Sequence, residues 1–287
     1  FLIHNFYPAK IFAGDSGALF LGFIISSIPL IVKSERKTLI DNKKNIIFVI
    51  IYIILFCALV YSGSKIYNWY RENNNNKQIA KRISNVVTVV QNDNFEEKEK
   101  YKIDFDALEE QNDETVAWIK VNNTNVEYPI VKAENNSFYL DHSFDKSYNS
   151  AGWIFADYRN NFDGTDKNIV VYGHNRRDGS MFASLKDALS PEWYENDENM
   201  DILFDTKNEN STYKIFSIYQ IEEEDYYIKT DFDAEIEFQN FIDTIAKRSV
   251  KDFEVEVTGE DSILTLSTCA NNNKYRVVIH AKKMQNV

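Results

Sequence analysis

The feature that most constrains this chain is a run of 16 uncharged, mostly apolar residues at 46–61, IIFVIIYIILFCALVY. With the Ser62–Ser64 segment, the run approaches the length of about 20 residues with which an α-helix crosses the hydrocarbon core of a bilayer. Aromatic residues follow at the depth where membrane helices meet water: Tyr61, Tyr67, Trp69 and Tyr70. We therefore predict one transmembrane helix that contacts the membrane over residues 46–62.

The charges around this run indicate its orientation. Five basic residues precede it between Lys33 and Lys44, whereas three follow it within sixteen residues. Because positively charged flanks stay in the cytoplasm, we expect a single-pass protein of the cell membrane whose larger part is extracellular. No small-residue cleavage site follows the run, so a signal peptide is disfavoured. The earlier apolar segment 17–32 contains Pro29 and falls short of the roughly 20 residues that a span needs, so it is only a possible span and we treat it as non-spanning.

The rest of the chain divides by composition. Residues 33–70 form a basic flank and the transmembrane helix, and the polar residues 71–100 predict a stalk or N-terminal helices. The core domain covers 101–287. Residues 72–287 hold 24 Lys/Arg against 41 Asp/Glu, with no basic stripe. Such an acidic surface repels a phosphate backbone, so we exclude nucleic acid as a partner.

Alternating apolar residues predict that the core domain is mainly β. A strand, a turn and a second strand are indicated by VAWIKVNNTNVEYPIV, where the alternation breaks at two asparagines. Four more strands are predicted at 167–173, 211–221, 262–268 and 275–282. Residues 231–249 instead repeat apolar side chains at helical spacing behind an acidic start. Many short strands with one inserted helix predict a β-barrel with added helices.

Two residues near the C-terminus suggest thiol chemistry. Cys57 lies within the apolar run, so Cys269 is the one cysteine of the core domain and cannot form a disulfide there. Cys269 follows one predicted strand, and Arg276 begins the next after six residues. A hairpin-like return would bring the guanidinium beside the sulfur, where it favours thiolate and donates to an oxyanion. The alternatives are a small buried cysteine and a solvated arginine on an edge strand.

Four histidines compete for the role of acid and base. His174 follows the predicted strand NIVVYG in a loop, where a rigid scaffold commonly presents catalytic groups. His142 lies among acidic and turn residues and is interpreted as a surface histidine. His280 shares a strand face with Arg276 and is interpreted as a core or hydrogen-bonded residue. His4 lies in the N-terminal segment and is excluded.

Three motifs in order resemble the sortases, enzymes of Gram-positive bacteria that attach proteins to the cell wall: NIVVYGHN around His174, TLSTC ending at Cys269, and YRVVIHAK around Arg276. The segments GWIFADYRN and MFASLKD extend this similarity, which covers residues 101–287. The helix expected before the cysteine strand resembles the insertion of class B members. The resemblance implies an eight-stranded sortase barrel in which the three residues meet at one end of a substrate groove.

The resemblance also implies a reaction. The thiolate of Cys269 attacks the carbonyl of a threonine in a C-terminal sorting signal, and an amine of a peptidoglycan precursor resolves the acyl-enzyme. His174 exchanges protons with the two amines, while Arg276 stabilises the oxyanion or holds the substrate. Ser267 and Thr268 are candidate groove residues without assigned roles. The implied partners are surface proteins that bear a sorting signal, and neither a cofactor nor a metal is expected.

Residues 1–32 resemble a different family. The stretch FYPAKIFAGDSGALFLGF is similar to a motif of the polyprenyl-phosphate sugar-1-phosphate transferases, in which the acid at Asp15 lies at a metal and pyrophosphate site. The other helices and acidic motifs of that family are missing. We therefore expect a non-functional fragment from a gene boundary, a reading-frame error or a fusion, and give a glycan transferase little weight.

Two other functions stay open beside the transpeptidase. A thiol endopeptidase would pass the same acyl group to water, and only an added amine separates the two activities. A non-catalytic, membrane-tethered binding module would use a degenerate barrel. The intact residues Cys269, His174 and Arg276 argue against that module.

Overall fold

A computed structural model describes residues 42–84, 87–90, 100–222, 224–270 and 274–285. The chain divides into two compact units, Phe1–Arg71 and Glu72–Val287. Of the sequence predictions, those for His4 and Asp15 lie outside the described residues.

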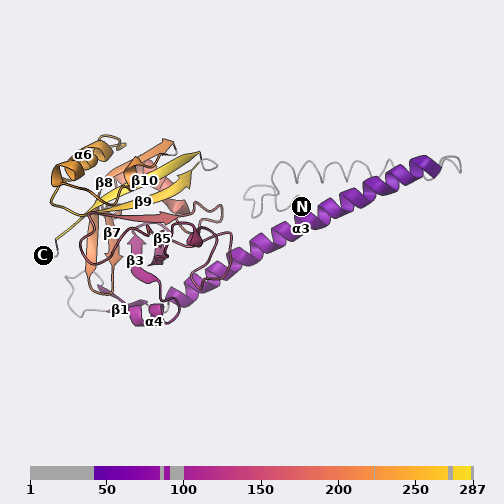
Figure 1. Ribbon diagram of the computed structural model, residues 1–287, viewed down its shortest axis with the longest axis horizontal. Coiled ribbons are helices and arrows are strands. Elements are labelled where there is room, and N and C mark those ends of the chain that lie inside the picture. Colours follow the sequence, from indigo (N-terminus) through magenta and orange to yellow (C-terminus); the bar gives the residue numbers. More distant parts are fainter. Residues whose placement is uncertain (1–41, 85–86, 91–99, 223, 271–273, 286–287) are drawn as a thin grey trace. The chain divides into compact units, whose positions relative to one another are not determined.

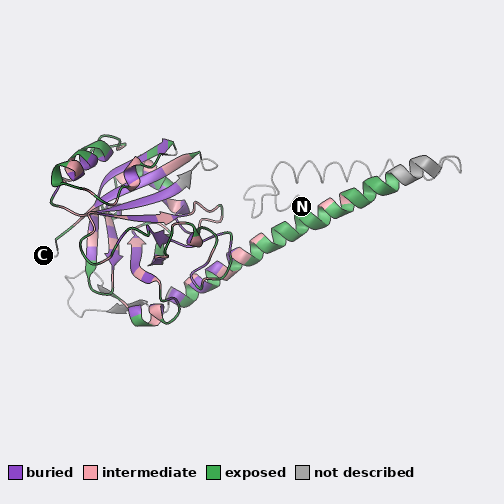
Figure 2. Ribbon diagram, viewed as in Figure 1, coloured by how far each residue is buried: buried purple, intermediate pink, exposed green. Residues whose placement is uncertain are grey.

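The described part of the first unit is helical. Helix α3 (Asn42–Ser84) includes the whole apolar run, so the helix predicted at residues 46–62 is confirmed. Apolar side chains such as Phe56 and Tyr61 are about two-thirds exposed to the surroundings, 67% and 65%. The described helical segment Phe48–Ile83 contains an apolar stretch that is long enough to cross a membrane, judged by length and composition alone. Most of the described length of α3 before its last turns is accordingly coloured as exposed in Figure 2.

The second unit is built on a closed barrel of eight strands (Figure 1). The strands follow one another around the barrel in the order β10-β8-β7-β3-β4-β5-β6-β9. Their bounds are β3 (Thr115–Val121), β4 (Glu127–Val131), β5 (Phe155–Ala156), β6 (Asn168–Gly173), β7 (Asp201–Asp205), β8 (Asn210–Glu222), β9 (Ile263–Ala270) and β10 (Tyr275–Lys283). Neighbours pair antiparallel except β4 with β5 and β6 with β9, which are parallel. The predicted eight-stranded barrel is confirmed.

Each predicted strand falls on a strand of the barrel, but β5 and β7 were not predicted. β5 has only two residues and β7 has five, so neither offers enough alternation to be recognised. A further antiparallel pair is formed by β1 (Val87–Val90) and β2 (Lys100–Ile103). The remaining helical segments are short: α4 (Phe105–Glu109), η1 (Phe138–Leu140), η2 (Ala183–Leu189), α5 (Pro191–Tyr194), η3 (Asp197–Asn199) and η4 (Tyr226–Ile228).

The long helix predicted at 231–249 is α6 (Glu235–Ala246). Its apolar stripe buries Phe238, Phe241, Ile242 and Ile245 in one cluster with residues of β8, β9 and β10. Figure 2 shows α6 with a buried face and an exposed face, as the 3.6-residue period requires. The helix therefore packs against the strands β9 and β10, which carry Cys269 and Arg276. Each fully buried apolar side chain contributes about 1.5–3 kcal/mol to the stability of the fold.

Asp205, at the end of β7, has a buried carboxyl group, and burial disfavours its charged form. The residue is only 9% exposed, and burial raises its pKa to about 6 although a hydrogen bond from the Ser211 backbone lowers it. The folded protein therefore binds a proton there more tightly than the unfolded chain does. This preference stabilises the fold at low pH and is lost as the pH rises through 6.

We predict that Asp205→Asn raises the free energy of unfolding at pH 7.5 by about 1 kcal/mol, a value reduced for screening by solvent. The amide needs no ionisation and keeps an oxygen for the Ser211 N–H. Urea unfolding measures the effect, which should shrink towards pH 4. Asp201→Asn is the control, because the Asp201 carboxylate pairs with Lys214 at 3.1 Å and gains nothing from neutralisation. A gain from Asp205→Asn that is equal at both pH values would contradict the assignment.

Candidate active site

Strand β9 lies between β6 and β10, and this order brings the three sequence-predicted residues together. In the parallel pair β6/β9, Gly173 stands opposite Thr268, so the residues that follow them lie side by side. His174 comes directly after the end of β6, and Cys269 is the last residue but one of β9. In the antiparallel pair β9/β10, Cys269 stands opposite Arg276. The backbone of Cys269 thus has His174 on one side and Arg276 on the other. The structure describes the backbone of Cys269 but not its side chain.

A pocket of about 600 Å³ opens at this end of the barrel. His174 and Arg276 both line it, as do Ser267 and Thr268, which the sequence indicated as groove residues. The other lining residues come from the ends of strands and from the connections that carry η1 and η4: Asn136, Leu140, Phe155, Tyr172, Gly173, Glu224, Asp225, Tyr227 and Ile228. Most of the lining surface is apolar, although about half of the lining residues carry a polar or charged group, among them Glu224, Asp225 and Arg276. An apolar surface with several directed polar groups is usual for a site that binds an organic ligand.

The ring of His174 is held by one defined hydrogen bond. Its Nε2 lies 2.8 Å from the carbonyl oxygen of Leu140. Because a carbonyl only accepts, Nε2 carries the proton, and Nδ1 is the nitrogen that can take up or release a second one. The backbone carbonyl of His174 also accepts from the Phe182 N–H at 3.0 Å, which fixes the loop after β6.

Gly152 packs against the same ring. Its φ is +60°, and a Cβ there would lie 2.9 Å from His174 Cδ2 and 2.5 Å from the carbonyl oxygen of Tyr139. No larger residue fits without moving backbone, so this position requires glycine. The glycine and the Leu140 carbonyl together fix where the imidazole lies.

Three other polar residues line the pocket: Ser267, Thr268 and Arg276. Thr268 is 2% exposed, and its Oγ1 has no hydrogen-bond partner among the described residues. The neighbouring Ser267 Oγ is instead 2.9 Å from the hydroxyl of Tyr227. Arg276 is partly buried, and its Nη1 donates to the Tyr275 carbonyl at 3.3 Å. Its guanidinium brings several N–H donors to the pocket wall.

Comparison with known proteins assigns this arrangement to a family. The model of the sortase domain matches residues 119–284, more than half of the chain. The chain belongs to the sortase family. Sortase B of Listeria monocytogenes is 32% identical over 236 residues, which is 80% of this chain and 94% of that protein. The prediction of a class B sortase-type cysteine transpeptidase is confirmed.

Solved sortase structures agree. The crystal structure of sortase B from Bacillus anthracis aligns with a TM-score of 0.66 at 32% identity, covering 76% of this chain and all of that one. The Staphylococcus aureus sortase B–substrate complex aligns with a TM-score of 0.60 at 35% identity, over 64% of this chain and 85% of that one.

The N-terminal segment matches a second family, as its sequence indicated. The model of glycosyl transferase family 4 matches residues 1–33. A probable undecaprenyl-phosphate N-acetylglucosaminyl 1-phosphate transferase of Bacillus subtilis is 61% identical over 39 residues, 14% of this chain and 11% of that protein. The match is confined to this short segment.

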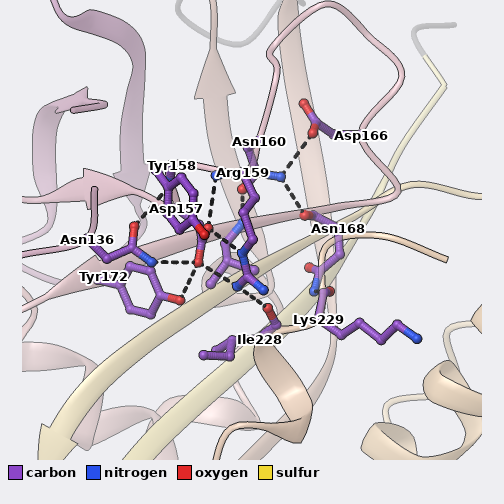
Figure 3. A network of polar contacts seen from close by, with 11 residues as sticks. Asn136, Asp157, Tyr158, Arg159, Asn160, Asp166, Asn168, Tyr172, Ile228 and Lys229 are labelled. Atoms are coloured by element: carbon purple, nitrogen blue, oxygen red, sulfur yellow. Dashed lines mark hydrogen bonds and ion pairs between the residues drawn. The ribbon is translucent and has the colours of Figure 1, made fainter. Parts of the chain in front are cut away.

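In this sortase a buried carboxylate organises one wall of the pocket (Figure 3). Asp157 is fully buried and accepts two hydrogen bonds from the Arg159 guanidinium, at 2.8 and 2.7 Å. It also accepts from the Tyr172 hydroxyl at 2.7 Å and from Asn136 Nδ2 at 2.9 Å, and both of these residues line the pocket. Sequence analysis missed Asp157, although it lies in the quoted segment GWIFADYRN, because its partners come from other elements.

Arg159 extends this network to η4, whose residue Ile228 also lines the pocket. Its Nη2 donates to the Ile228 carbonyl at 2.8 Å, which ties down the end of η4 (Figure 3). Burial alone would raise the pKa of Asp157, but the hydrogen bonds from Arg159, Tyr172 and Asn136 hold it below its ordinary value. The ionised carboxylate therefore stabilises the folded state above pH 4, and that stabilisation is lost as the pH falls.

We predict that Asp157→Asn lowers the free energy of unfolding at pH 7 by about 2–3 kcal/mol, because an amide cannot accept all of these donors. Thermal unfolding measures the change. The difference between the variant and the wild type should shrink as the pH falls towards 3, because the wild-type protein then loses the stabilisation that its ionised Asp157 provides. Asp163→Asn, at an exposed turn of the same connection, is the control and should change the melting temperature little. Equal losses in the two variants would refute the role given to Asp157.

The other two histidines of the described residues, His142 and His280, do not line the pocket. His280 is fully buried, with Nδ1 2.8 Å from Thr265 Oγ1 and Nε2 2.9 Å from the Tyr219 hydroxyl. Burial lowers the pKa of His280 to about 3, so it stays neutral, and its predicted structural role is confirmed. His142 stacks on Phe138 and pairs with Asp141 at the surface, as predicted. Within the described residues, no group of three His, Cys, Asp or Glu side chains could hold a metal ion.

Proposed function

We propose that this protein is a membrane-anchored transpeptidase that cleaves a C-terminal sorting signal after threonine and joins the carbonyl to a cell-wall amine. The observation that carries the proposal is the position of β9, whose Cys269 has His174 at the neighbouring strand end and Arg276 in register on the other side. This order supplies a nucleophile, a proton carrier and an oxyanion donor, which together make up the set that acyl transfer by a thiol needs.

The first half of the proposed reaction forms an acyl-enzyme. The thiolate of Cys269 attacks the threonine carbonyl carbon, and the electron pair of the C=O bond moves onto oxygen. Arg276 donates to this oxyanion. When the C–N bond breaks, the leaving amine takes a proton from Nδ1 of the His174 imidazolium, and a thioester remains.

The second half reverses the proton transfer. An amine attacks the thioester carbonyl, neutral His174 accepts its proton at Nδ1, and the C–S bond breaks to restore the thiolate. The Leu140 carbonyl supports this cycle, because it holds Nε2–H in both protonation states and leaves Nδ1 to change. The product is an amide when the acceptor is an amine and an acid when it is water.

The pocket supports a peptide as the substrate. It has about 600 Å³ and a largely apolar lining surface, and Thr268 Oγ1, which has no partner within the described part of the chain, offers a hydrogen bond to a bound peptide. A structural relative at 35% identity is described as a sortase B–substrate complex. Surface proteins with a sorting signal are therefore the proposed donors, and a peptidoglycan precursor amine is the proposed acceptor.

The proposed location follows from α3. Its segment from Phe48 has the length and composition of a membrane span, and basic residues precede it. The sortase domain, at residues 101–287, then lies outside the cell, after the basic flank and span at 33–70 and the polar segment 71–100. Residues 1–32 take no part in this function.

We predict that Cys269→Ala abolishes peptide cleavage, a loss of at least about 10³-fold, because no other group forms the thioester. The full chain in detergent is incubated with fluorescence-quenched threonine-containing sorting peptides, with and without an amine, and products are identified by mass spectrometry. Cys57→Ala is the matched control and should cleave at the wild-type rate.

An amide product that appears only with the amine supports transpeptidation. Hydrolysis that an amine never diverts would identify a thiol endopeptidase instead. No cleavage of any peptide, with a Cys269 thiol no more reactive than an ordinary one, would leave a non-catalytic binding module. Cleavage that survives in Cys269→Ala would contradict the proposed nucleophile.

A further inference from the structure

The last turns of α3 carry a polar face that is buried in the second unit. Asn73 and Asn76 are only 7% and 5% exposed, and Ile79 and Ile83 continue the same face at helical spacing. Of the two asparagines between them, Asn74 is exposed. The helix therefore turns some asparagines of this run of four towards the protein and others towards solvent. The buried side-chain amides need hydrogen-bond partners within the protein.

Asn76 finds these partners in the segment that packs against His174. Its Nδ2 donates to the Gly152 carbonyl at 3.2 Å. Its Oδ1 accepts from Ser143 Oγ at 2.5 Å and from Asn149 Nδ2 at 2.9 Å. Since Gly152 touches the His174 ring, a shift of this segment moves the surface on which the imidazole rests.

Asn73 holds the chain on the other side of His174. Arg176 follows the histidine by two residues, and its Nη2 donates to Asn73 Oδ1 at 2.6 Å. Its Nη1 donates to the Ser150 carbonyl at 3.4 Å. One guanidinium thus connects the His174 loop, the Gly152 segment and the helix.

We propose that the buried face of α3, Asn73 and Asn76, positions His174 for proton transfer. Neither asparagine touches substrate; both act through Gly152 and Arg176 on the imidazole. The inference rests on the proposed role of His174 as acid and base. It assigns a catalytic support function to the end of the helix whose earlier residues form the candidate membrane span.

The expected effect is on turnover and not on substrate affinity. A small misplacement of a catalytic group can cost about 100-fold in rate. We expect Asn76→Ala and Asn73→Ala to lower kcat by about 10-fold to 100-fold and to change KM less than about twofold. The limb of the kcat–pH profile that reports His174 should shift in both variants.

Two variants complete the kinetic set. Asn74→Ala alters an exposed residue of the same run and should match the wild type. Arg176→Lys keeps the charge but loses the planar fork, so it should resemble Asn73→Ala. If Asn76→Ala does not fold, Asn73→Ala and Arg176→Lys carry the test, since they leave the Asn76 contacts in place.

A measurement without substrate separates this inference from the proposed function. In nitrogen-15 spectra of the full chain in detergent, wild-type His174 should show the Nε2–H tautomer, and Asn73→Ala or Asn76→Ala should give a mixture. His280 is buried in its own hydrogen bonds and serves as the unchanged reference. If the wild type cleaves no peptide, the proposed function fails. The tautomer shift still tests whether the asparagines of α3 position the His174 ring through Gly152 and Arg176.

The inference is overturned by variants that fold with a lower melting temperature yet keep the wild-type kcat, pH profile and His174 tautomer. Such a result would make the buried face of α3 a contributor to stability alone. It is also overturned if Asn74→Ala loses as much turnover as Asn76→Ala, because the effect would then not depend on the buried face.

Discussion

The parallel pairing of β6 with β9 is the constraint on which the candidate site depends. Gly173 opposite Thr268 sets the register, and the two following residues are His174 and Cys269. Both strands end at the same edge of the barrel, so His174, directly after β6, and Cys269, near the end of β9, lie at that edge together. A slip of one residue would separate them and turn the alternating side chains of β9 to the other face.

Around this register the protein uses backbone groups to fix side chains. The Leu140 carbonyl holds the imidazole, and a glycine with positive φ lets the chain approach the ring. The buried Asp157 joins Asn136 and Tyr172, and Arg159 links it to the carbonyl of Ile228, another residue that lines the pocket. Buried networks of this kind restrict the geometry more than isolated surface contacts do, because breaking one partner leaves the others unsatisfied.

The helix α3 has two kinds of surface. Its earlier residues expose large apolar side chains, which suits a lipid environment, whereas its last turns bury asparagines and isoleucines in the second unit. The proposed positioning of His174 by Asn73 and Asn76 gives that polar end a part in proton transfer. A tethering helix and a catalytic support would then be one continuous element.

The sequence by itself determined the apolar helix, most strands of the barrel and the helix α6, because each has a local period that burial imposes. The motifs around His174, Cys269 and Arg276 identified the family before any contact was known. Only the tertiary structure decided which partners those residues have. The asparagines of α3, the carboxylate of Asp157 and the short strands β5 and β7 carry no local signal, since their roles come from residues far away in the chain. Long-range pairing and burial, rather than local pattern, therefore determine how the candidate histidine is held.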